Sequence, residues 1–168
     1  MRQTTINFTL HDVTKKTEIQ QFYRDMEQES DRCLSILIAA YFDEALGTLF
    51  GSNAPDGFNS RICAGLQRGM LTQEEHDDLH LIRRIRNEFA HEYLSKTFDQ
   101  PKEGLIDQLK TVQCHKGVLH TVGFNSAKNK LRYVAIAFCV RIANGLWSPD
   151  GGQRERWDDK AFPAFSTK

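Results

Sequence analysis

The segment from Thr72 to Tyr93 constrains the fold more than any other part of the chain. It opens with TQEE, a capping box in which Thr72 and Glu75 satisfy free backbone amides at a helix start. Apolar residues then recur every three or four positions, the spacing that places them on one face of a helix. We therefore predict a long helix over 72–93 with one apolar face, made of Leu79, Ile82, Ile85, Phe89, Ala90 and Tyr93.

The same helical period dominates the rest of the chain and predicts an all-α fold, a compact bundle around a long central helix. A helical pattern runs from Thr14 to Phe50, where Gly51 ends it, and its length favours a bend near Ser30. The second half of this pattern is apolar on nearly every side. A helix of that kind belongs at the centre of a bundle.

Further helices are expected over 58–69, 101–110 and 126–146. Asn59 or Ser60 is the expected cap of the first, and Gly69 closes it. The last carries an apolar face made of Leu131, Val134, Ala135, Phe138 and Ile142. Residues 112–124 are rich in β-prone side chains, so at most one small β-hairpin is expected there.

The chain contains no repeats or linkers, so we expect a single helical domain over residues 1–168. Residues 1–13 form an N-terminal arm in this interpretation, and residues 147–168 form an irregular C-terminal tail. The tail is unusually aromatic, with Trp157, Phe162 and Phe165. Such surplus apolar surface favours a homodimer, because two-fold self-pairing is the commonest way to bury it.

Charge and hydropathy limit the possible partners. Lys plus Arg and Asp plus Glu each total 22, so the net charge is zero. Proteins that clamp DNA unaided usually carry a basic excess, so we expect DNA binding to be weak or indirect. No stretch approaches the 18 apolar residues of a membrane span, and the four cysteines lack a CxxC pair. We expect a cytoplasmic protein with reduced thiols and no membrane partner.

A second side of the 72–93 helix carries a polar stripe of unusual chemistry. Its members are His76, His80, Arg83, Arg84, Asn87 and His91. The stripe is our candidate binding surface, although a solvated helix face is the simpler reading. Arg86 falls instead within the apolar arc, where a guanidinium needs a carboxylate. We therefore predict a structural ion pair between Arg86 and Glu44 or Asp43.

The sequence favours neither a metal nor a cofactor. HDDLH (residues 76–80) is similar to the zinc-protease motif HExxH. Aspartate in place of glutamate reaches a metal-bound water poorly, however, and no segment that could supply a third ligand follows. Cys114, His115 and His120 lack a cysteine pair that would complete a metal site. No glycine-rich phosphate loop or GxSxG nucleophile motif is present.

Three blocks of sequence resemble the mannitol operon repressor family of bacterial regulators. They are ILIAAYFDEAL (36–46), FNSRI (58–62) and LTQEEHDDLHLIRRIRNEFAH (71–91), in the order and spacing of that family. The likeness covers roughly residues 28–100. It implies an all-helical protein of transcriptional repression that lacks a standard DNA-binding motif and acts through partner proteins. The stretch around residues 114–124 departs from the family.

The last block is also similar to the HEPN superfamily, whose signature is an arginine and a histidine separated by four residues. Arg86, Asn87 and His91 fit that signature. The resemblance implies a metal-independent ribonuclease, toxin or defence effector. In that reading Arg86 stabilises the phosphate charge, Asn87 has an orienting role, and His91 acts as general acid or base. Our first interpretation remains a non-enzymatic repressor-type adaptor. The ribonuclease is the alternative, and RNA is a partner only there.

Overall fold

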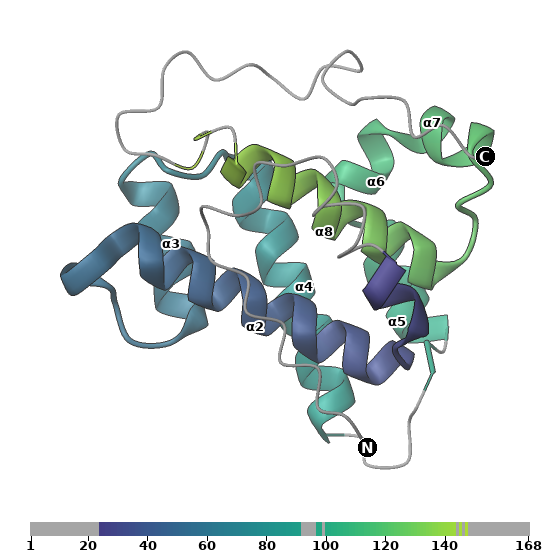
Figure 1. The fold of residues 1–168 in the computed structure, drawn as a ribbon, viewed down its shortest axis with the longest axis horizontal. Helices are drawn as coiled ribbons and strands as arrows, with labels where there is room; N and C mark the ends of the chain where they lie inside the picture. The colour runs from purple at the N-terminus through teal and green to yellow at the C-terminus, as the bar shows by residue number, and fades with distance from the viewer. Residues whose placement is uncertain (1–23, 92–96, 99, 144, 146, 148–168) are drawn as a thin grey trace.

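The structure is a computed structural model that describes residues 24–91, 97–98, 100–143, 145 and 147. The described chain is all-helical and contains no strand, which confirms the predicted fold class. A short helix covers residues 24–28 (Figure 1). The other elements are α2 (Asp31–Phe50), the 3-10 helix η2 (Gly51–Asn53), α3 (Phe58–Gln67), α4 (Gln73–His91), α5 (Gln100–Asp107), α6 (Lys110–Cys114), α7 (Lys116–Thr121) and α8 (Ala127–Ala143).

The predicted bend near Ser30 is confirmed. Ser30 has extended backbone angles and caps α2, because its hydroxyl accepts the Cys33 N–H at 3.1 Å. At the other end α2 stops at Gly51, whose φ of 60° suits a glycine. The stretch Asp31–Asn53 is long and apolar enough to cross a membrane, a test that the core helix of a soluble protein also passes.

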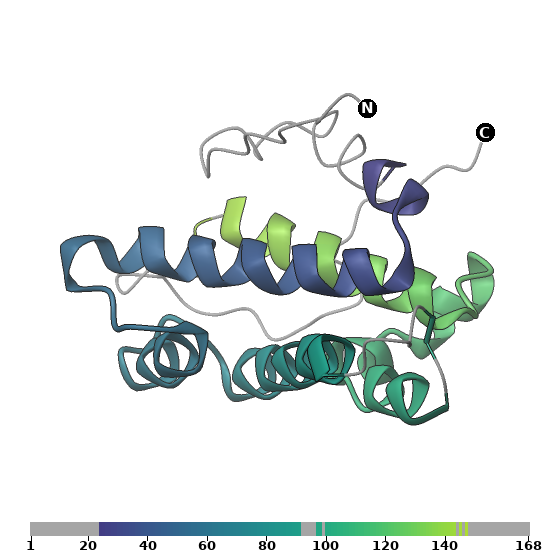
Figure 2. The same ribbon diagram turned by 90° about the horizontal axis from the view of Figure 1, so that it is seen from below.

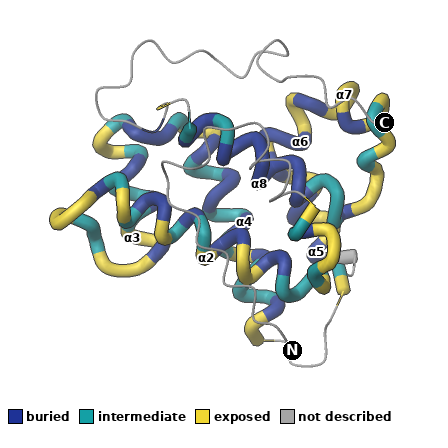
Figure 3. Tube along the Cα trace, in the orientation of Figure 1, coloured by how far each residue is buried: buried dark blue, intermediate teal, exposed yellow. Residues whose placement is uncertain are grey.

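The helices form two layers, which Figure 2 shows edge-on. One layer holds α2 and α8, and the other holds α3, α4 and α5. The core lies between them, and α8 is buried along almost its whole length (Figure 3). At the centre, the ring of Phe42 lies 5.4 Å from that of Phe138 and 6.1 Å from that of Trp147. Burying each such side chain stabilises the fold by roughly 1.5–3 kcal/mol.

Most of the expected core faces are confirmed. Leu79, Ile82, Ile85 and Phe89 of α4 are buried, whereas Ala90 is exposed. All five residues predicted for the core face of α8 are buried. Helix α3 begins after Gly57, which caps it through its backbone, so the prediction of Asn59 or Ser60 as the cap was wrong. The predicted arm (1–13), Tyr93 and the aromatic tail residues Trp157, Phe162 and Phe165 lie outside the described residues.

The expected β-hairpin is wrong, because residues 110–121 form the helices α6 and α7. The β-prone side chains conceal a helical spacing: Leu109, Val112, His115 and Leu119 are buried, three or four positions apart. Burial of that face against α4 and α8 outweighs the local preference of the chain for strand. Local propensity decides little in helices of five and six residues, which are too short to form alone.

Candidate functional site

The position of α4 is fixed at its first turn by a buried glutamate. The capping box forms as predicted: the Thr72 N–H donates to Oε2 of Glu75 at 2.7 Å, and the Glu75 N–H donates to the Thr72 hydroxyl at 3.2 Å. The other carboxylate oxygen pairs with the guanidinium of Arg141 and accepts the indole N–H of Trp147 at 2.9 Å. Because Glu75 is only 1% exposed, these contacts hold a charge inside the protein.

One turn further along α4, the buried Asp78 caps another helix. Its carboxylate accepts the backbone N–H groups of Lys110 and Thr111 and, at 2.7 Å, the Thr111 hydroxyl. The residue before α6, Leu109, has no side-chain cap of its own, so Asp78 supplies one from a distance. Burial raises the pKa of Asp78, and the bonds from Thr111 and Lys110 oppose part of that rise. The sequence predicted Glu75 only as a helix cap and gave no role to Asp78, because Arg141 and Lys110, which these acids contact, lie more than 30 residues away.

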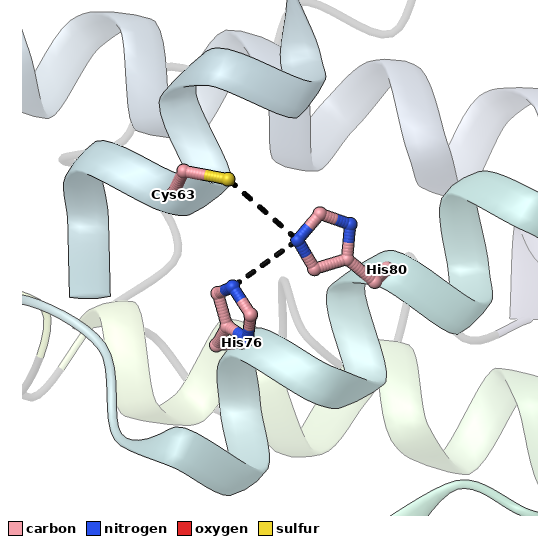
Figure 4. Close-up of side chains that lie close together, drawn as sticks. All are labelled: Cys63, His76 and His80. Atoms are coloured by element: carbon pink, nitrogen blue, oxygen red, sulfur yellow. Dashed lines mark hydrogen bonds between the residues drawn. The ribbon is translucent and has the colours of Figure 1, made fainter.

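The polar stripe lines an open groove of about 410 Å³. Four of its predicted members lie there: His80, Arg83, Arg84 and Asn87, together with Asp77 and Leu81. His91 is exposed at the end of α4 and does not line the groove, and His76 faces α3 instead (Figure 4). No described residue accepts a hydrogen bond from the buried Nε of Arg83. The exposed Arg84 and the half-buried Asn87 offer cationic and amide donors to a ligand from outside.

At the α3 end of the stripe, two histidines and a cysteine converge (Figure 4). The two Nε2 atoms of His76 and His80, one helical turn apart, lie 3.1 Å from each other. The Sγ of Cys63, from α3, lies 3.9 Å from Nε2 of His80. Asp77 approaches from the other side, with Oδ1 3.0 Å from Nδ1 of His76. This is the one cluster of potential metal ligands among the described residues, and we had not expected Cys63 in it.

The electrostatics of the cluster follow from its position. Partial burial, with electrostatic contributions from His76 and Arg83, lowers the pKa of His80. Burial also works against the charge of Asp77, but hydrogen bonds from His76 and Gln73 outweigh it and lower the pKa of that carboxyl. His80 therefore favours the neutral form, and Asp77 favours the ionised one.

The predicted ion pair between Arg86 and Glu44 or Asp43 is wrong. Asp43 is taken by Arg61 of α3, whose guanidinium lies 2.7 Å from the Asp43 carboxylate. Arg61 also donates to the Pro55 carbonyl at 2.9 Å, which ties it to the loop before α3. Glu44 is exposed and Arg86 is half-buried, and Arg86 has no carboxylate partner among the described residues.

The structure does not bring the ribonuclease signature together within one chain. Arg86, Asn87 and His91 all lie on α4, which stays helical through His91. Five positions along a regular helix turn the side chain by ~140°, so Arg86 and His91 point to different sides. Convergence on one phosphate would need a second chain.

The other possible ligands remain apart. Cys114 and His120 are exposed, and His115 is buried with its ring 5.7 Å from that of Tyr133. All four cysteines are free thiols. The spacing of Cys63, His76 and His80 was the available signal for the cluster. Twelve residues separate the cysteine from the first histidine and three separate the histidines, as in the second half of a zinc-finger pattern.

Comparisons with known proteins found no match that would assign a function. No protein-family model, curated protein or solved structure matches the chain. The resemblances described above thus rest on their sequence blocks alone.

Proposed function

We propose that the protein is a repressor-type transcriptional regulator that acts as a helical adaptor through a partner protein. The observation that carries this proposal is the groove on α4, where the buried Nε of Arg83 lacks an acceptor among the described residues. A buried donor without an acceptor needs an explanation, and in this proposal the acceptor comes from a partner protein. The resemblance to the mannitol operon repressor family supports the same role.

The groove suits an acidic surface of another protein. Arg83, Arg84 and Asn87 present donors from one rigid helix, which Glu75 and Asp78 fix at its first two turns. Arginine is enriched at protein interfaces because its planar fork binds carboxylates in two-point geometry. The net charge of zero gives little general attraction to DNA, so in this proposal DNA binding is weak or indirect.

The proposal also includes a homodimer in the cytoplasm. Ile36 and Leu37 lie next to each other on α2 and are 39% and 41% exposed, which favours self-association. Four free thiols suit a reducing compartment. Light scattering on the purified protein should report two chains per particle. A monomer throughout the micromolar range would contradict this part of the proposal.

The regulatory role is tested by deleting the gene in its own host and measuring transcripts. We expect a defined set of transcripts to rise, and wild-type protein to restore their repression. Arg84→Glu should fold normally but fail to restore it, whereas Lys116→Glu, a charge reversal at another exposed position, should restore it fully. Unchanged transcripts, or tight sequence-specific DNA binding by the purified protein alone at physiological salt, would refute the proposal.

A ribonuclease is the second candidate, favoured by one observation. Asp43 pairs with Arg61 and not with Arg86, so the expected acid does not neutralise Arg86, as a role in phosphate binding requires. The test is RNA cleavage in the presence of a chelator, comparing wild type with His91→Ala and with the exposed control His120→Ala. Under our first proposal none of the three cuts RNA. Cleavage that His91→Ala alone abolishes would make the ribonuclease the better assignment.

A further inference from the structure

The cluster of Cys63, His76 and His80 has the atoms and the spacing of a metal site (Figure 4). Each residue offers one ligand atom, and the three atoms lie within 4.8 Å of one another. Two come from one face of α4 and the third from α3. Imidazole nitrogen and thiolate sulfur are the ligands that zinc prefers.

The distances can be compared with those of a tetrahedral zinc centre. Zn–N bonds of ~2.05 Å and a Zn–S bond of ~2.3 Å place two nitrogens about 3.3 Å apart and a nitrogen and sulfur about 3.6 Å apart. In the structure the Nε2 atoms of His76 and His80 are 3.1 Å apart. The Sγ of Cys63 is 3.9 Å from the nearer of them, Nε2 of His80. These two separations lie within a few tenths of an ångström of the tetrahedral values, and the third pair, Cys63 and His76, lies within 4.8 Å.

The surroundings orient the ligands as in known zinc sites. Metal-binding histidines usually donate their second ring N–H to a carboxylate, which fixes the tautomer and ring position. Nδ1 of His76 lies 3.0 Å from Oδ1 of Asp77, which leaves Nε2 as the ligand atom facing His80 and Cys63. The backbone is equally fixed. Gly65, two residues after Cys63, packs so closely on Leu71 that a Cβ added to the glycine would lie 2.8 Å from Cδ1 of Leu71.

A hydrogen-bonded cluster is the competing explanation. One histidine would donate Nε2–H to the other, and the Cys63 thiol would remain a weak third partner at 3.9 Å. That arrangement requires the two histidines, and the sulfur adds only a weak hydrogen bond to it. The two explanations differ in whether Cys63 contributes to binding a divalent ion.

We propose that Cys63, His76 and His80 bind one zinc ion, with Asp77 as the carboxylate that orients His76. Three protein ligands leave the fourth position to water or to a donor from another molecule, as in open zinc sites. The proposal goes beyond the regulatory role and does not depend on it.

The test uses the full chain, reduced, stripped with a chelator and dialysed against Zn²⁺, followed by metal analysis by mass spectrometry. We expect one zinc per chain. Titration with Co²⁺ should give a thiolate-to-metal charge-transfer band. Cys63→Ser and His80→Asn should each weaken zinc binding by roughly 100-fold or more, and Asp77→Asn by roughly 10-fold, the scale on which orienting partners act.

Matched controls come from the same chain. Cys114→Ser and His120→Asn change an exposed cysteine and an exposed histidine outside the cluster, and both should bind zinc like wild type. Circular dichroism of the metal-free variants checks that each one folds. A wild-type protein that takes up no zinc and gives no cobalt–thiolate band overturns the proposal. So does zinc uptake that survives Cys63→Ser or is lost in Cys114→Ser.

Discussion

Replacing Glu75 with glutamine tests the central electrostatic contact of the fold. Glutamine matches glutamate in size and also serves in a capping box, so the helix start at Thr72 is kept. What the variant removes is the negative charge beside Arg141 and one of the two acceptor oxygens. The indole N–H of Trp147 depends on the same oxygen as Arg141.

The magnitude follows from the burial of this pair. The Glu75 side chain is 0% exposed and that of Arg141 is 8% exposed, so water cannot replace the lost partner. Removing one member of a buried pair typically costs ~3–5 kcal/mol. Taking the lower value of about 3 kcal/mol, a domain of this size should melt roughly 6–12 °C lower.

The assay is thermal and urea unfolding of wild type, Glu75→Gln and the neighbouring Glu74→Gln. Glu74 is exposed on the same helical turn, and its variant should stay within about 0.5 kcal/mol of wild type. A cycle with Arg141→Gln completes the test, because the two changes should be less than additive if the residues interact. If Glu75→Gln melted like Glu74→Gln, the argument that this pair stabilises the core would be refuted.

Three further predictions concern packing and exposure. Arg86→Ala should cost less than about 1 kcal/mol in urea unfolding, because the half-buried side chain has no carboxylate partner among the described residues; a loss of 3 kcal/mol or more would contradict that. Gly65→Ala should destabilise by roughly 1 kcal/mol through crowding in the core, whereas Gly104→Ala, which meets nothing within 4 Å, should stabilise by up to ~1 kcal/mol; equal effects would exclude crowding as the cause. Burial raises the pKa of Cys139 to about 12. Alkylation at pH 8 followed by mass spectrometry should therefore label the exposed Cys114 in the folded protein, and Cys139 only after unfolding. Labelling of Cys139 in the folded protein would show that α8 opens.

The sequence alone predicted the structure correctly where the deciding residues lie close together within one helix. The capping box at Thr72, the bend at Ser30 and the core face of α8 depend on residues within one or two turns of each other. The prediction of a hairpin over residues 112–124 was wrong because their composition favours strand whereas their spacing favours helix. The buried positions Leu109, Val112 and Leu119 already carried the period of a helix.

Individual partners in the candidate site were harder to predict, since they depend on how two helices approach. The polar stripe on α4 was visible in the sequence, and four of its members line one groove. The partner of Asp43 was wrongly predicted, because its carboxylate pairs with Arg61 of α3 and not with Arg86. The position of Cys63 beside the histidines also depends on the packing of α3 on α4, and the zinc-finger-like spacing was the one sequence signal for it.

The capping of α6 by Asp78 has a consequence for hydrogen exchange. The amides of Lys110 and Thr111 lie in the first turn of a helix. Backbone N–H groups there have no partner within the helix, so their protons normally exchange with water as the helix end frays. Here both donate to a carboxylate on α4. We therefore expect their protons to exchange when α6 separates from α4, so their exchange rates should report how often these two helices come apart in the folded protein.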